Sequence, residues 1–223
     1  MKKATVVLML FALIASSLVL TGCGDDDDDD NGDPVNYFPI ATGNMWEFDY
    51  AITFDADGDT LESGTYTQEF IGTKDIEGME YYVLRDNPDT TSVMYYRQGD
   101  DYVWGGMDQQ VLTSLVTVLF KAVPTDVDAG QNWSEEYEIT TGLTATVYGE
   151  SREMVDLETP AGTFEDCIHV NLRFTTSVPS IDPDSINFWI APEVGPVKYI
   201  SYTPNDEPNT TKTSYLTNYT IVD

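Results

Sequence analysis

The chain has 223 residues and carries 39 acidic against 10 basic residues, which gives a net charge of −29 at pH 7. Nucleic acids bind proteins through clusters of Lys and Arg, and this sequence has none, so we expect no nucleic-acid partner. The single histidine, His169, excludes a zinc site built from two or three histidines of one chain.

The N-terminus has the pattern of a secretory signal. Two lysines precede the apolar run Val6 to Leu20, which is shorter than the about 20 residues that a spanning helix needs. The run ends in Leu20-Thr21-Gly22-Cys23, which resembles the lipobox of bacterial lipoproteins. The resemblance implies that residues 1–22 are a cleaved signal peptide and that Cys23 carries the lipid. It further implies a Gram-negative outer-membrane lipoprotein that faces the periplasm or the cell surface and touches the membrane through its lipid.

An acidic stretch follows the cysteine. Asp25 to Asp30 repel one another and keep the chain extended, so residues 23–36 are expected to form a lipidated, disordered tether. Residues 37–223 then form a single β-domain, with 37–122 and 123–223 as candidate halves. If Cys23 is lipidated, Cys167 has no partner within the chain and is expected to be a free thiol.

Apolar and polar residues alternate through residues 37–223, as in half-buried strands. Trp46, Phe48 and Tyr50 alternate with polar neighbours, and no strand–long helix–strand pattern occurs. The pattern predicts an all-β fold, an antiparallel curved sheet that forms a partly open barrel or a sandwich, with two similar lobes as an option. Met107 to Lys121 fits helical spacing as well, but its β-branched residues favour strands. The other expected strands are 65–71, 79–85, 92–98, 102–104, 167–174, 186–190, 197–203 and 213–222.

A short motif occurs twice. The pattern Gly-x-x-Trp-x-x-x-Tyr is found at Gly43, Trp46 and Tyr50, and again at Gly130, Trp133 and Tyr137. The repeat favours two similar lobes or two equivalent entries into one sheet, and a chance match is the alternative.

Three segments carry a resemblance to a family. They are Phe38-Pro39-Ile40-Ala41-Thr42-Gly43-Asn44-Met45-Trp46, Pro160-Ala161-Gly162-Thr163-Phe164-Glu165-Asp166-Cys167 and Trp189-Ile190-Ala191-Pro192-Glu193-Val194-Gly195-Pro196-Val197-Lys198. They resemble the TapB-like group of uncharacterised envelope lipoproteins, which implies antiparallel curved sheets and offers no catalytic residues. Two residues depart from the pattern at a turn, Glu193 in place of Gly and Pro196 in place of Leu. The segments that begin at Pro160 and Pro192 are expected to be tight turns.

Asp55, Asp57 and Asp59 are the candidate metal ligands. They resemble part of a calcium loop, but Thr60 and Tyr66 stand where an EF-hand needs glycine and glutamate. An Asp-Gly hairpin turn explains the same residues, so calcium is an alternative and no other cofactor is expected.

Catalytic residues are not expected. His169 is two residues from Cys167, which would allow a nucleophile pair, but a strand with a mixed polar face explains both residues. The paired tyrosines Tyr81-Tyr82 and Tyr95-Tyr96 place rings on both faces of a sheet, where core packing is favoured over an exposed binding surface. We therefore expect a non-enzymatic binding or carrier module for an apolar ligand, a glycan or an envelope protein. The alternatives are a structural or assembly lipoprotein and a carboxylate-dependent envelope hydrolase.

Overall fold

The computed structural model describes residues 35–54, 57–88, 93–111, 114–140, 142–176, 185–203 and 210–222. The predicted signal peptide, Cys23, the acidic run and Asp55 lie outside these residues. Within the described ranges no helix is long and apolar enough to cross a membrane. The strands found there are β1 (Met45–Phe54), β2 (Thr60–Ile76), β3 (Met79–Asn87), β4 (Val93–Gln98), β5 (Tyr102–Val111), β6 (Ser114–Pro124), β7 (Asn132–Thr140), β8 (Leu143–Thr159), β9 (Gly162–Thr176), β10 (Ser185–Ala191), β11 (Gly195–Thr203) and β12 (Thr210–Thr220).

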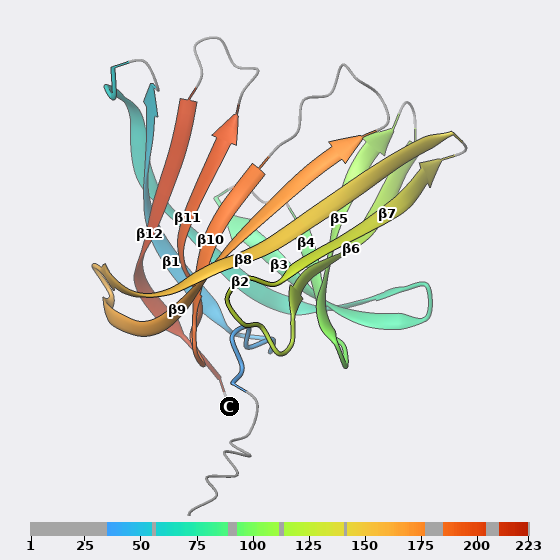
Figure 1. Ribbon diagram of the computed structural model, residues 1–223, viewed down its shortest axis with the longest axis horizontal. Helices are drawn as coiled ribbons and strands as arrows, with labels where there is room; N and C mark the ends of the chain where they lie inside the picture. The colour runs from blue at the N-terminus through green and yellow to red at the C-terminus, as the bar shows by residue number, and fades with distance from the viewer. Residues whose placement is uncertain are drawn as a thin grey trace, which may run out of the picture. The chain divides into compact units, whose positions relative to one another are not determined.

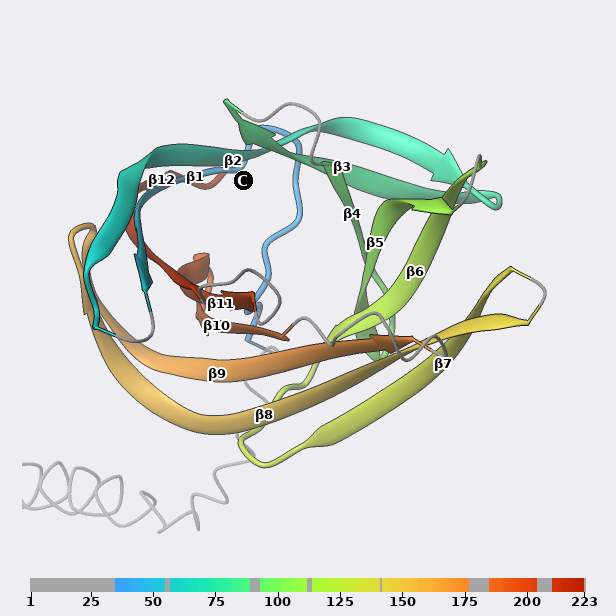
Figure 2. The same cartoon turned by 90° about the horizontal axis from the view of Figure 1, so that it is seen from above.

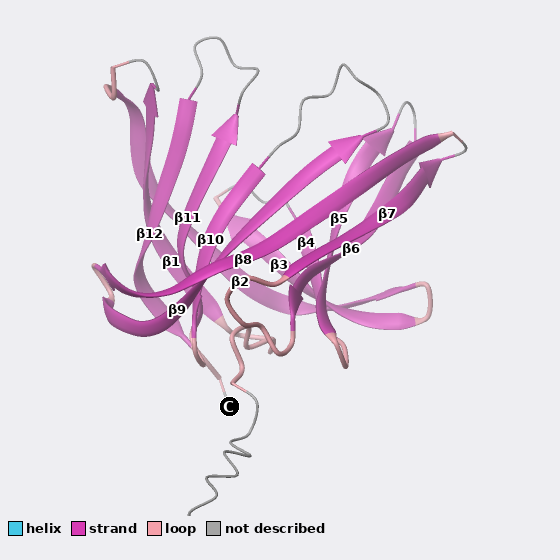
Figure 3. Cartoon of the chain, in the orientation of Figure 1, coloured by secondary structure: helices cyan, strands magenta, loops and turns pink. Residues whose placement is uncertain are grey.

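The strands of the described chain form one antiparallel sheet in the order β6-β5-β4-β3-β2-β1-β12-β11-β10-β9-β8-β7. Strands β1 to β6 and strands β7 to β12 are two consecutive meanders, which join where β1 pairs with β12. The sheet curls into a nearly closed barrel, and the view from above shows its strands around an interior (Figures 1 and 2). Figure 3 shows strand throughout the sheet. The prediction of an all-β, partly open barrel is confirmed.

The segment 107–121 consists of strands. Residues up to Val111 belong to β5 and residues from Ser114 belong to β6, and the two strands pair antiparallel. The residues of β6 alternate as a strand requires: Val118 and Phe120 are buried, while the half-buried Thr117 lies on the opposite face and donates to Asp108.

The repeated motif occupies equivalent positions in the two meanders. Gly43 and Gly130 have positive φ angles, 97° and 86°, and each is followed by the first strand of its meander. The indole N–H of Trp46 donates to the carbonyl of Val194 at 2.7 Å, and that of Trp133 donates to the carbonyl of Lys121 at 3.1 Å. The two tryptophans therefore begin the two meanders in the same way.

One continuous cluster of apolar side chains lies inside the described barrel and draws on both meanders. Phe120 of β6 and Phe174 of β9 meet edge to face with ring centres 5.2 Å apart. In the same cluster, Phe48 of β1 contacts the rings of Tyr66 and Tyr199. Burial of these rings helps to hold the two meanders together.

The chain before β1 packs against the same core. Tyr37 and Phe38 are buried, and the buried Asn44 donates to the carbonyl of Pro39 and accepts from the N–H of Val222. Asn36, which the sequence assigned to the end of the tether, exchanges two bonds with Glu193: its N–H donates to Oε1 at 3.0 Å, and its carbonyl accepts from the Glu193 N–H at 2.8 Å. Glu193 has a φ angle of 58°, the left-handed region that favours glycine.

The paired tyrosines pack on both faces of the sheet. Tyr82 and Tyr96 contact the interior cluster, whereas Tyr81 and Tyr95 form a second cluster with Ile76 on the outer face. The expectation that both sets of rings pack rather than project into solvent agrees with their positions.

Candidate functional site on the outer face of β7 to β10

Four neighbouring strands present polar side chains in rows across the outer face of the barrel. Asn132 lies opposite Glu150, Glu150 opposite Asn171, and Asn171 opposite Asn187. The next row brings Ser134, Tyr148 and Arg173 together. The rows arise because side chains alternate between the two faces of a strand, and the other face of β8 and β9 is occupied by Val147, Ser151, Val170 and Leu172.

These side chains line a depression of about 440 Å³. Its residues are Asn132, Trp133, Ser134, Tyr148, Gly149, Glu150, Arg152, Asn171 and Arg173. Tyr148 is 41% exposed, and the guanidinium of Arg173 lies 4.9 Å from the centre of its ring. The depression therefore combines one accessible aromatic face with amide, hydroxyl, carboxylate and guanidinium groups.

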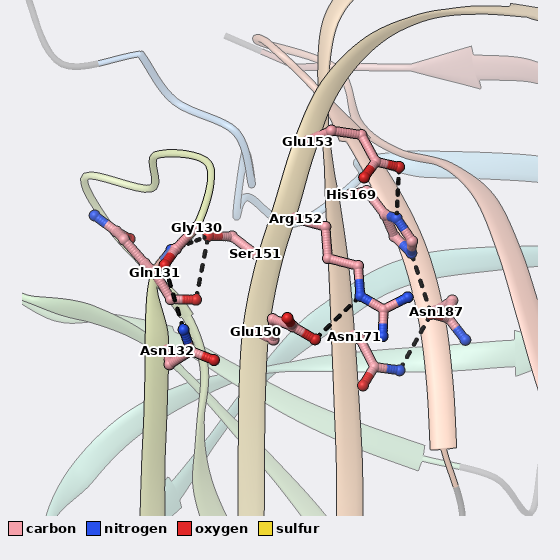
Figure 4. A network of polar contacts seen from close by, with 10 residues as sticks. All are labelled: Gly130, Gln131, Asn132, Glu150, Ser151, Arg152, Glu153, His169, Asn171 and Asn187. Carbon is pink, nitrogen blue, oxygen red and sulfur yellow. Dashed lines mark hydrogen bonds and ion pairs between the residues drawn. The ribbon is translucent and has the colours of Figure 1, made fainter.

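A β-bulge extends the polar surface toward β10. The pairing of β8 with β9 is irregular between Ser151 and Met154, so Arg152 and Glu153 both reach the outer face. Arg152 Nε contacts Glu150 Oε2 at 3.0 Å, and Glu153 Oε1 contacts His169 Nδ1 at 3.2 Å. Figure 4 shows these side chains side by side along β8 and β9.

His169 and two asparagines complete the network. Asn187 Oδ1 contacts His169 Nε2 at 3.1 Å and accepts from Asn171 Nδ2 at 3.1 Å (Figure 4). The imidazole stacks on Trp189 with ring centres 4.2 Å apart, and Lys198 Nζ lies 4.4 Å from the Trp189 ring centre. Stacking and hydrogen bonds fix His169, and through Asn187 they orient Asn171 at the edge of the depression.

The loop before β7 is fastened to β8 by Ser151. Its buried hydroxyl donates to the carbonyl of Asp128 and accepts from the N–H of Gln131 at 3.0 Å. Two backbone bonds join Gly130 and Gln131 to the same residue. Asn132 therefore enters the depression from a fixed backbone.

Of the residues proposed from the sequence, His169 belongs to this network, whereas Asp57 and Asp59 do not line the depression. Among the described aspartates of the calcium candidate, Asp57 Oδ1 accepts from the Asp59 N–H at 3.0 Å, a local turn contact. No group of three or more metal-ligating side chains occurs in the part of the chain that the structure describes. With Asp55 outside those residues, the calcium alternative stays a prediction, as does lipidation of Cys23.

Cys167 and His169 do not share partners. The Cys167 thiol is buried in the interior cluster and donates to the carbonyl of Phe164 at 3.4 Å, while His169 is held by Glu153 and Asn187. Burial raises the pKa of the Cys167 thiol to about 11, which keeps it protonated and a poor nucleophile at neutral pH. These surroundings fit a structural thiol and give no support to a nucleophile pair.

Sequence analysis missed the rows of the depression. Asn171 and Arg173 were visible as polar positions in an alternating strand, but their neighbours come from β7, β8 and β10. Only the register between strands shows that they are adjacent.

No protein-family profile matches the chain, and no curated protein matches it. Among solved structures it is similar to a presumed exported protein with a YmcC-like fold from Bacteroides fragilis, with a TM-score of 0.45 and 14% identity over 83% of this chain and 99% of that one. It is also similar to a presumed lipoprotein from Parabacteroides distasonis, with a TM-score of 0.44 and 16% identity over 84% of this chain and 100% of that one. The resemblance to the TapB-like group stays a prediction.

Proposed function

We propose that the protein is a non-enzymatic lipoprotein of the Gram-negative cell envelope, anchored through Cys23 in the outer membrane, which binds a saccharide on the outer face of β7 to β9. The observation that carries the proposal is the depression in which Asn132, Glu150 and Asn171 lie in one row beside the exposed ring of Tyr148. Saccharides offer alternating hydroxyl donors and acceptors together with apolar ring faces. Amides, a carboxylate and an aromatic ring complement both features.

The lining supports binding in preference to hydrolysis. Glycoside hydrolysis requires two carboxyl groups, about 5 to 10 Å apart, on either side of the scissile bond. Among the residues that line the depression Glu150 supplies the carboxylate, and Arg152 already pairs with it. Glu153 contacts His169 outside this lining, so the lining itself supplies no second acid for the hydrolase alternative.

The carrier alternative would use the interior of the barrel. Apolar side chains of both meanders meet there, as Phe120 and Phe174 do. Such a core fits the structural or assembly alternative as well, so a binding measurement must separate these two functions.

Isothermal titration calorimetry with oligosaccharides released from envelope polysaccharides tests the proposal. Tyr148→Ala should weaken binding about fivefold, because one aromatic contact is worth about 1 kcal/mol. Tyr215→Ala is the matched control: that ring is 37% exposed and has Lys198 5.2 Å from its centre, yet it lies on β12. It should change affinity less than twofold, and chromatography should recover the bound oligosaccharide intact.

Absence of binding by every oligosaccharide would reject the proposal and favour the assembly function. Equal losses in the two variants would place the binding surface elsewhere. Cleavage of the oligosaccharide would reject the non-enzymatic part.

A further inference from the structure

Within the described residues, each strand of the sheet is hydrogen-bonded to the strands next to it in the order. The two end strands, β6 and β7, do not pair with each other. We call this place the β6–β7 seam. Each of its strands has one edge whose N–H and C=O groups are free of a neighbouring strand, and such an edge is a template for another chain.

Side chains close the seam at one point. The N–H of Lys121 donates to the hydroxyl of Tyr137 at 3.0 Å, and its carbonyl accepts from the indole of Trp133 at 3.1 Å. Its ammonium group lies 2.8 Å from Glu135 Oε2. Three β7 side chains thus satisfy one β6 residue and take the place of a strand ladder there.

Further along the seam the two strands enclose a depression of about 320 Å³. Its lining comes from residues 117–119 of β6, residues 136–138 of β7 and Glu77 in the turn between β2 and β3. Glu77, Glu136 and Glu138 are exposed, and the lining contains no Lys or Arg. An occupant that makes the backbone bonds of the edge and also carries positive charge would complement these three carboxylates.

A buried polar group lies near this depression. The hydroxyl of Tyr81 is inaccessible and has no hydrogen-bond partner among the described residues, and Tyr81 belongs to the outer cluster that Leu119 packs against. Burial is the main cause that raises the pKa of Tyr137, and the nearby Tyr81 hydroxyl adds to the shift. An unsatisfied hydroxyl next to an unpaired edge indicates that the polar groups here are incompletely matched within the chain.

We propose that the β6–β7 seam accepts an extended basic peptide segment of a partner protein, which adds to the free strand edge and directs Lys or Arg side chains at Glu77, Glu136 and Glu138. Main-chain bonds supply affinity in this mode of recognition, and alternate side chains supply specificity. A divalent cation is the competing occupant, but these carboxylates do not form a metal-binding group in the described chain. The proposal is independent of saccharide binding on the outer face.

Fluorescence anisotropy with a labelled 12-residue peptide of alternating Lys and Thr tests it. The wild-type protein should bind this peptide and should not bind its Glu-for-Lys counterpart. Glu136→Gln/Glu138→Gln should weaken binding roughly tenfold, because each exposed charge pair is worth at most about 1 kcal/mol. Glu158→Gln/Glu165→Gln removes two exposed carboxylates from β8 and β9 and should change affinity less than twofold.

Hydrogen exchange separates strand addition from general charge attraction. The peptide should slow amide exchange in residues 134–138 of β7, and a peptide N-methylated at alternate bonds should lose both binding and protection. Equal weakening by the two double variants, equal binding of the N-methylated peptide, or the same protection from calcium alone would each overturn the proposal.

Discussion

Replacing Gly149 by alanine should break the side-chain closure between β6 and β7. Gly149 lies opposite Trp133, and a Cβ there would come well within 3.0 Å of three indole atoms, a separation that real Cβ atoms do not reach. The ring must move by about 1 Å or more to regain ordinary carbon contacts of about 3.5 Å. The displaced atoms include Nε1, which donates to the Lys121 carbonyl.

The cost follows from these two effects. Overpacking a filled site costs about 1 to 3 kcal/mol, and a carbonyl left without its donor adds about 1 kcal/mol. We expect Gly149→Ala to lower the free energy of unfolding by about 2 to 4 kcal/mol. For a domain of this size each kcal/mol lowers Tm by about 2 to 4 °C.

Urea unfolding of a double-mutant cycle provides the assay. In a Trp133→Ala background the ring is gone, so the additional cost of Gly149→Ala should fall below about 1 kcal/mol. A cost below about 1 kcal/mol in the wild-type background, or additive costs in the cycle, would mean that the ring does not occupy the space above Gly149.

Three further predictions concern single groups. Trp133→Phe and Trp46→Phe each remove one indole hydrogen bond, and each should lower the free energy of unfolding by about 1 to 2 kcal/mol. Only Trp133→Phe should speed amide exchange along β6 and β7. Equal exchange rates in the two variants would contradict this expectation. The raised pKa of Cys167 means that the folded state holds the thiol proton more tightly. Stability should therefore fall by up to about 2 kcal/mol from pH 9 to pH 11 in denaturant titrations, and Cys167→Ala should lack that part of the fall. Glu193→Gly relieves a left-handed residue but loses an exposed bond to Asn36, so stability should change by less than about 1 kcal/mol while proteolysis near Asn36 becomes faster.

The elements of the sheet could be predicted because they depend on local signals. Alternation places Trp46 and Phe48 on one face of β1, and both are buried. The sequence Pro160-Ala161-Gly162 marks the turn between β8 and β9, the two long strands that it joins. Glu193 stood out as a departure from glycine, and its φ angle of 58° explains why glycine suits that position.

The candidate site could not be predicted because it depends on pairing. Asn132, Glu150, Asn171 and Asn187 become a row only through three strand registers, and a shift of one residue would turn any of them to the other face. The contact between Glu153 and His169 depends in addition on a β-bulge that sequence patterns do not indicate. The β6–β7 seam could not be predicted either, because the sequence does not show which two strands lie at the ends of the sheet.

A crystal structure of the protein with an envelope oligosaccharide would show whether the sugar binds on the outer face of β7 to β9. We expect a sugar ring against Tyr148, with its hydroxyls bonded to the row that runs from Asn132 to Asn171. An oligosaccharide inside the barrel, or on a face without β7 to β9, would contradict it.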